Sequence, residues 1–162
     1  MSVIRQLIIA CGLILLPVGG LAQNTSVALG GLQQDTTLPV EVSADSLSVD
    51  QENGTAVFDG NVVIGQGEMR LAAGRVLVVY AEDQSRIRRL EASGGVTLVT
   101  GPDAAEAERA DYDIDAGTVV MSGDVLLTQG TNALTSDSMT VDLKTGSAEM
   151  QGRVKTVLQS RD

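Results

Sequence analysis

The sequence contains no histidine and no tryptophan, and its single cysteine is Cys11. Histidine is the most frequent general base in enzymes, and histidine and cysteine are the usual ligands of zinc. Phe58, Tyr80 and Tyr112 are the only aromatic residues in the 162-residue chain. These absences exclude histidine-based catalysis, and they require a hydrophobic core built from Val, Leu, Ile, Met and Ala.

Long apolar runs are also scarce, and the one that exists lies near the start. Leu7 to Leu16 follow a basic residue and precede Gly20-Leu21-Ala22, which is typical of a secretory signal peptide. We expect residues 1–22 to be removed, which leaves a mature chain from Gln23 without cysteine. The alternative, lipid attachment at Cys11, is disfavoured because too few apolar residues precede it. No other run reaches the roughly 20 residues that a membrane-spanning helix needs.

Acidic residues outnumber basic ones. Removing Arg5 from the 11 basic residues leaves 10 against 21 acidic residues, a mature net charge of −11. This excess disfavours binding to nucleic acid and simple electrostatic docking on anionic membranes. Asp111, Asp113 and Asp115 resemble a calcium loop, but Ala116 stands where an EF-hand needs glycine and Ser122 where it needs glutamate. We therefore expect no metal, no cofactor and no enzymatic activity.

A Gly-x-Val motif recurs along the chain. It begins at Gly60, Gly94, Gly123 and Gly152, in steps of 34, 29 and 29 residues. Further glycines lie seven residues after the first three motifs, at Gly67, at Gly101 and at Gly130. A fixed period of this length indicates a stack of similar structural units, each of which contacts only its neighbours.

Aspartates keep the same phase as this repeat. Asp50, Asp113 and Asp142 lie ten residues before a motif glycine, and a further glycine lies six before it in each case, as in Asn53-Gly54. Aspartate in a turn accepts hydrogen bonds from its own backbone, and glycine there tolerates a positive φ. The repeated aspartates therefore predict tight turns and not a calcium site.

Alternating apolar and polar residues after Pro39 predict strands. Val40 and Val42 alternate with polar neighbours, and each unit continues in the same way, bent at its glycines. We predict an all-β domain of 14 to 16 short strands, with residues 102–107 as a loop or single turn. The domain covers residues 39–158, after a flexible leader over 23–38 and before a C-terminal tail over 159–162.

Stacked strands of this kind form two opposed aliphatic faces. If these faces close tightly, the seam between them is only a core, and if they splay, it is a groove along the protein. The strands at the two ends of the stack are edges that can accept another chain by strand addition. The residues leave open whether the seam binds a ligand.

The chain resembles a known protein family. The stretch from Thr55 to Ile64, followed by Gln66-Gly67 and then by Met69 to Ala73, looks like the OstA-type signature of LptA-type periplasmic lipopolysaccharide-transport proteins. The first strand from Pro39 and the later Ser122-Gly123-Asp124-Val125 and Gly152-Arg153-Val154 segments match the family's first strand and later repeats. The resemblance covers roughly residues 39–158.

The resemblance implies an open, V-shaped β-jelly roll in the periplasm that binds the lipid A acyl chains of lipopolysaccharide. It also implies head-to-tail self-association and contact with LptC-type inner-membrane and LptD-type outer-membrane β-jelly-roll domains. Two alternatives are an LptC-like anchored component and a β scaffold that binds no lipid. The lipid-binding residues carried over from the family are Val40, Val42, Leu47, Val49, Phe58, Val62, Ile64, Met69, Leu71, Val76, Val78, Val96, Leu98, Tyr112, Val125, Leu127, Met139 and Val141.

Overall fold

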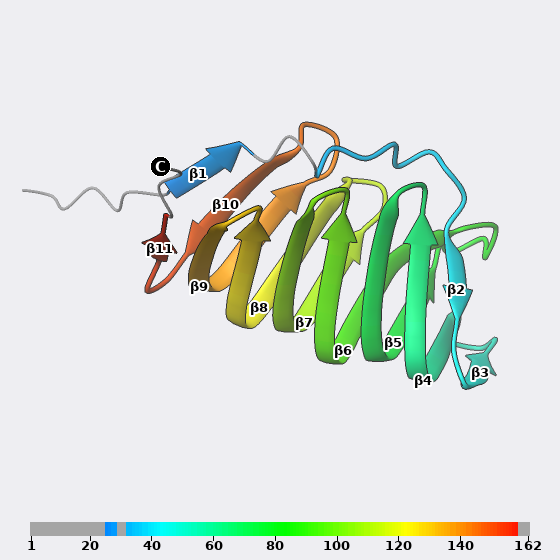
Figure 1. Cartoon of the computed structure of the whole chain (residues 1–162). Coiled ribbons are helices and arrows are strands. Elements are labelled where there is room, and N and C mark those ends of the chain that lie inside the picture. The colour runs from blue at the N-terminus through cyan, green and yellow to red at the C-terminus, as the bar shows by residue number, and fades with distance from the viewer. Residues whose placement is uncertain (1–24, 29–31, 159–162) are drawn as a thin grey trace, which may run out of the picture.

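The computed structural model describes residues 25–28 and 32–158, and within them every regular element is a strand (Figure 1). All pairings are antiparallel, in the order β1-β10-β9-β8-β7-β6-β5-β4-β2, with β3 also on β4 and β11 also on β9. The strands are β1 (Thr25–Ala28), β2 (Glu41–Ser43), β3 (Ser46–Asp50), β4 (Thr55–Gln66), β5 (Met69–Tyr80), β6 (Ile87–Thr100), β7 (Asp103–Asp113), β8 (Thr118–Gln129), β9 (Asn132–Asp142), β10 (Ser147–Gln151) and β11 (Lys155–Val157).

The six strands from β4 to β9 are long, and each folds across a common crease. Pairing registers shift near the middle of these strands, for example between Asp59 and Val62 and between Ser122 and Val125. The crease divides the sheet into two leaves. Leaf A contains β1, β3, β10 and residues 55–59, 75–80, 87–93, 109–113, 118–122 and 138–142, and leaf B contains β2, β11 and residues 62–66, 69–73, 96–100, 103–107, 125–129 and 132–136.

The motif glycines produce this crease. Gly60, Gly94, Gly123 and Gly152 all have φ between 79° and 85°, and the residue after each also has a positive φ. Two successive left-handed residues turn the chain sharply, and few residues other than glycine adopt that conformation without strain. The repeat therefore marks where each unit passes from one leaf to the other.

A second row of residues lies against the crease glycines. Asp45 packs on Gly60, Glu108 on Gly123 and Asp137 on Gly152, whereas Gly94 meets another glycine, Gly74. Main-chain bonds from Asp45 N to Gly60 O and from Asp137 N to Gly152 O, both 2.9 Å, fix this approach at the two ends. The crease positions thus require glycine for two reasons: their φ is positive, and there is no room for a Cβ atom.

The turns at the rim of leaf A confirm the role predicted for the repeated aspartates. Asp50 Oδ1 accepts from the Asn53 N–H at 3.1 Å, and Asp113 Oδ1 accepts from the Ala116 N–H at 2.9 Å. Asp142 Oδ1 accepts from the backbone N–H groups of Lys144 and Thr145 at 2.9 and 3.0 Å. These bonds also lower the pKa of Asp142, chiefly through the Thr145 N–H.

Three expectations about the elements are wrong. The chain forms 11 strands over its described residues instead of 14 to 16, because the crease glycines bend the long strands without ending them. Residues 103–107 begin β7, where pairing on both sides outweighs the helix-like composition. The expected leader also contributes β1, which pairs with β10, and it places Leu32 fully inside the core.

Candidate functional site

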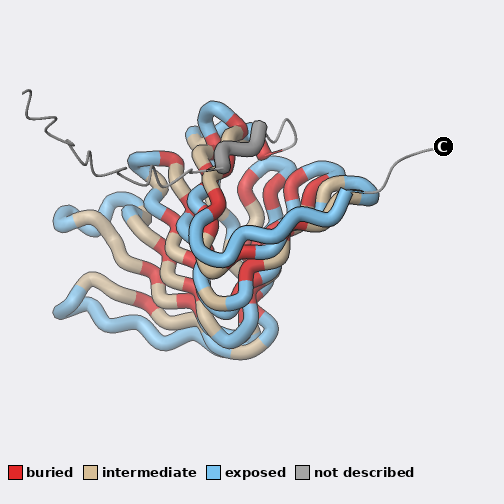
Figure 2. Tube along the Cα trace, turned by 90° about the vertical axis from the view of Figure 1, so that its left-hand side faces the viewer, coloured by how far each residue is buried: buried red, intermediate tan, exposed pale blue. Residues whose placement is uncertain are grey.

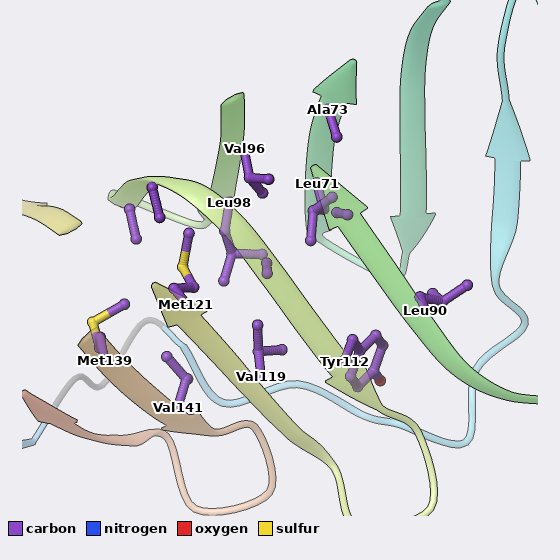
Figure 3. Close-up of a cluster of buried hydrophobic side chains, with 14 of the residues drawn as sticks. Leu71, Ala73, Leu90, Val96, Leu98, Tyr112, Val119, Met121, Met139 and Val141 are labelled. Atoms are coloured by element: carbon purple, nitrogen blue, oxygen red, sulfur yellow. The ribbon is translucent and has the colours of Figure 1, made fainter. Parts of the chain in front are cut away.

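The inner faces of the two leaves meet in one apolar seam. Figure 2 shows the buried stretches lying between the two layers, with the tips of the hairpins exposed, and Figure 3 shows aliphatic and methionine side chains filling the space between strands. Thirteen of the eighteen residues predicted to bind lipid lie in this seam, each at most 2% exposed: Val62, Ile64, Met69, Leu71, Val76, Val78, Val96, Leu98, Tyr112, Val125, Leu127, Met139 and Val141.

The other five predicted residues lie at the N-terminal end of the stack. Val40, Val42 and Phe58 are partly buried and pack against the seam. Leu47 and Val49 are 56% and 61% exposed. They pair with Phe58 and Ala56 and so share a sheet face with the seam residues, but β3 has β4 as its one partner among the described strands. Their exposure therefore follows from their place on an edge strand.

The seam also contains residues that the family resemblance did not supply. Leu90 and Ala92 on β6, and Val119 and Met121 on β8, alternate in the same register as the predicted residues and are equally buried. Their alternation in the sequence is the signal that would have found them. The remaining additions are Leu32, Ala56, Ala73, Ala105, Ala107, Ala110, Leu134, Leu143, Ala148 and Met150.

One polar contact crosses the seam between the leaves. The Tyr112 hydroxyl of leaf A donates to Gln66 Oε1 of leaf B at 2.6 Å, and both side chains are 1% exposed. Gln66 Nε2 in turn donates to the carbonyl oxygens of Thr36 at 3.1 Å and Leu38 at 2.8 Å. Burial raises the pKa of Tyr112 to about 12, against the opposing effect of the hydrogen bond to Gln66.

Residues 32–40, which we call the strap, cross the rims of the two leaves. Gln34 N donates to Leu143 O at 2.6 Å and Gln33 Nε2 donates to Lys144 O at 3.1 Å, both on the rim of leaf A. The carbonyl groups of the strap accept from Gln66 on the rim of leaf B, as described above. Figure 1 shows this segment passing over the tops of the strands to reach β2. The strap thus ties the two rims together.

We predict that replacing Tyr112 with phenylalanine reduces the alkaline loss of stability. The unfolded chain releases the phenolic proton near pH 10, whereas the folded chain retains it to about pH 12. Unfolding is therefore favoured as pH rises through this interval, by about 1.4 kcal/mol per pH unit. Tyr112→Phe should remove this dependence and cost about 1–2 kcal/mol at pH 7, because Gln66 loses a buried donor.

The measurement is denaturant unfolding of both proteins between pH 8 and pH 11. Other titrating groups are common to the two proteins, so they cancel in the difference. Parallel stability curves above pH 10 would show that Tyr112 does not titrate from a buried position.

The aspartates that resembled a calcium loop each have separate partners. Asp111 accepts from Arg89 at 2.6 Å, Asp113 caps its turn, and Asp115 pairs with Arg86. Across residues 25–28 and 32–158, no three His, Cys, Asp or Glu side chains are grouped so that they could hold a metal ion. Within the same residues, no helix is long and apolar enough to cross a membrane.

The sheet, crease and seam define the class of the protein as a stack of antiparallel strands folded into an OstA-like β-jelly roll. The sequence profile of the family described as LptA/(LptD N-terminal domain) LPS transport protein matches residues 41–147. The chain belongs to this family, as the sequence resemblance predicted.

Two proteins are similar to this chain in sequence or in structure. An uncharacterized protein from Rhizobium meliloti (strain 1021), R00383, is 31% identical over 119 residues, which are 69% of this chain and 64% of that protein. The chain therefore spans less than two thirds of the length of this relative. The crystal structure of LptH from Pseudomonas aeruginosa, the LptA homologous periplasmic component of the lipopolysaccharide transport device, superimposes with a TM-score of 0.70. It is 20% identical, and the match covers 78% of this chain and 99% of LptH, which shows the shared fold.

Proposed function

We propose that this protein is a periplasmic carrier that holds the acyl chains of lipopolysaccharide between its leaves and passes the lipid from the inner toward the outer membrane. The observation that supports this proposal is the continuity of the seam. Inner-facing aliphatic residues follow one another across every long strand from β4 to β9, and the one charged side chain that is buried among the described residues is Asp103, at the start of β7. Family membership supports the same role in lipopolysaccharide transport.

The seam is suited to acyl chains because the leaves are held together by apolar contacts. Backbone hydrogen bonds run within each leaf, and Tyr112–Gln66 is the one buried side-chain bond between inner faces among the described residues. Acyl chains can replace leaf-to-leaf contacts with contacts of the same chemistry. Each methylene removed from water contributes about 0.8 kcal/mol, and methionines adapt to irregular partners because their side chains are flexible and unbranched.

The ends of the stack provide the surfaces for partners in this proposal. LptC-type and LptD-type domains of the same fold would add their edge strands to β2 and β3 at one end and to β11 at the other. Strand addition requires a free backbone edge, and β2, β3 and β11 each have one described partner strand. The periplasmic location rests on the expected signal peptide, which lies outside the described residues.

One observation favours the alternative of a scaffold that binds no lipid. The buried seam residues are packed against one another to 0–9% exposure, so lipid binding requires the leaves to separate. The two functions differ in whether a bound lipid contacts the inner faces, and the methionines of the chain offer a direct probe.

Photo-crosslinking from methionine tests the proposal. Apart from Met1, the methionines are Met69, Met121, Met139 and Met150, and all four lie in the seam. Replacing methionine with its diazirine analogue therefore places every internal probe on an inner face. We expect irradiation with lipopolysaccharide to give adducts at these four positions, because acyl chains lie against them.

The matched control carries leucine at all four positions and methionine in place of Val120. Val120 is next to Met121 on β8 but is 43% exposed on the outer face, and Met→Leu exchanges conserve volume. Equal adduct yields from the control and from the seam probes, or no adduct from the seam, would overturn the proposal in favour of the scaffold.

A further inference from the structure

A cavity of about 560 Å³ lies between the strap and the rim of leaf A. Leu38 and Val40 of the strap and Ile87 and Ile114 at the rim of leaf A supply its apolar lining. Arg86 and Lys144 also line it, from two different rim turns. We call this cavity the strap pocket.

The strap pocket adjoins the seam. Val40, Ile87 and Ile114 are partly buried and pack against the buried core cluster. Gln66, which lines the same cavity, is hydrogen-bonded to Tyr112 inside the seam. An apolar chain that occupies the pocket therefore contacts residues that are continuous with the core. Gln66 connects the two, because it is bonded both to the strap and to Tyr112.

The polar side of the pocket contains two cations and one carboxylate, those of Arg86, Lys144 and Asp115, although the whole chain has a net charge of −10. The Arg86 guanidinium pairs with the Asp115 carboxylate, and Lys144 Nζ donates to the Asp115 backbone oxygen at 3.0 Å. The Lys144 ammonium group has three N–H donors, so it can also donate to a further acceptor. Apolar walls beside two cations match a ligand that has an acyl chain and a phosphate group.

The strap is attached in a way that permits movement. Between Leu32 and Val40 it contains no strand, and its bonds to the leaves are those from Gln34 and Gln33 at one end and from Gln66 at the other. Leu32 is fully buried, whereas Leu38 is 41% exposed beside the pocket. The segment around Leu38 can therefore move without removing a strand from the sheet.

We propose that the strap pocket is the site at which a phosphorylated acyl amphiphile enters the seam, with Arg86 and Lys144 contacting the phosphate and the strap moving away from Gln66. This inference rests on the proposed function, because it assumes that the seam accepts acyl chains. It assigns the entry point to one place on the rim and gives the strap the role of a movable wall.

The first experiment fixes the strap. Leu38→Cys and Glu68→Cys are introduced into the full chain with Cys11→Ser, and the two thiols are joined by a short bismaleimide. Leu38 lies against Gly67, the neighbour of Glu68, so the crosslink holds the movable part of the strap on the rim of leaf B. Both positions are exposed, so folding should be unaffected, and the uncrosslinked sample of the same variant is the matched control for the two lost side chains. The probe is lipopolysaccharide with a fluorescent acyl chain. We expect the crosslinked protein to take it up at least about tenfold more slowly.

Equal uptake rates with and without the crosslink would overturn the entry proposal while leaving the proposed function intact. Failure of the uncrosslinked variant and of the unmodified chain to take up the probe at all would overturn both. The two outcomes are distinguishable because each rate is compared with the equilibrium level reached by the unmodified chain.

The second experiment tests the cations without touching the strap. The Arg86→Gln, Lys144→Gln double variant is compared with the unmodified chain, using the same lipopolysaccharide before and after enzymatic removal of its phosphates. We expect uptake of the phosphorylated probe to fall about three- to tenfold and uptake of the dephosphorylated probe to be unchanged. A loss that is the same for both probes, or no loss, would contradict phosphate contact at this site.

Discussion

Replacing Gly123 with alanine is expected to destabilise the protein by about 2–4 kcal/mol. Gly123 has a φ of 85°, which costs an L-residue about 1–2 kcal/mol. An added Cβ would also lie 2.5 Å from Glu108 Oε2 and 2.8 Å from Glu108 Cβ, and overpacking of this kind costs a further 1–3 kcal/mol, roughly. The effect should appear as a lower midpoint in denaturant unfolding, with an unchanged slope.

Gly130 provides the matched control. Its φ of 57° is also left-handed, but a Cβ there would have no neighbour within 4 Å. Gly130→Ala should therefore cost about 1 kcal/mol, the conformational part alone. If the two variants were equally stable, the close contact with Glu108 would not add to the destabilisation. Glycine would then be required at the crease only for its positive φ.

Replacement of Glu108 by glycine separates the two contributions further. The chain already contains a glycine opposite a crease glycine, because Gly74 lies against Gly94 in the second unit. Glu108→Gly gives the third unit the same arrangement, so Gly123→Ala should be less harmful in that background. We expect a coupling of at least about 1 kcal/mol in the double-mutant cycle.

The crease could be predicted from the sequence because its cause is local. A positive φ favours glycine, Asn and Asp, and Asn61, Gly95 and Asp124 follow their crease glycines in agreement with this preference, whereas Arg153 is the exception. Period-two alternation likewise predicted the strands and their aliphatic faces, whereas the individual seam residues were carried over from the family resemblance. Both signals depend on a residue and its immediate neighbours, and both recur in each unit, so the repeat reinforced them.

Other features depend on contacts between distant residues, and the sequence pattern did not contain them. Residues 103–107 have helix-like composition, but two neighbouring strands pair with them. Gln66 and Tyr112 are 46 residues apart and belong to no repeat. Leu47 and Val49 alternate as a buried strand would, yet they lie exposed because the stack ends there. The last strand of a stack has the same sequence pattern as an inner strand.

Removal of residues 155–162 is expected to abolish self-association. We propose that the head-to-tail association implied by the family resemblance runs through leaf B, because β1 covers β10 at that end of leaf A. The free edges of leaf B are β11, which contains Lys155, and β2, which contains Glu41. Exposed ion pairs contribute only about 0–1 kcal/mol, so most of the affinity should come from backbone pairing. The truncation removes β11 and leaves residues 132–136 of β9 as the leaf B edge. This edge lies two strands behind β1 at the edge of leaf A, so an incoming copy meets β1 and β10 before it reaches β9.

The truncation is placed after the crease so that the fold is retained. Arg153 is paired with Asp137 of its own chain. The shortened chain keeps this pair and also Gly152. Light scattering should show concentration-dependent oligomers for the intact chain and a monomer for the truncated chain, with similar unfolding midpoints for both.

Mixing the two proteins distinguishes head-to-tail growth from a symmetric dimer. A truncated chain retains β2, so in a head-to-tail arrangement it can add to the β11 end of an intact chain. At its other end it offers the next copy only the recessed edge of β9. It should therefore act as a chain terminator and shorten the oligomers in proportion to its molar fraction. A symmetric contact between two β11 edges would exclude the truncated chain, and the size of the remaining oligomers would not change. That result would contradict head-to-tail growth, and so would an intact chain that is monomeric at high concentration. Transfer of lipid between the membranes would then depend on contacts with partner proteins alone.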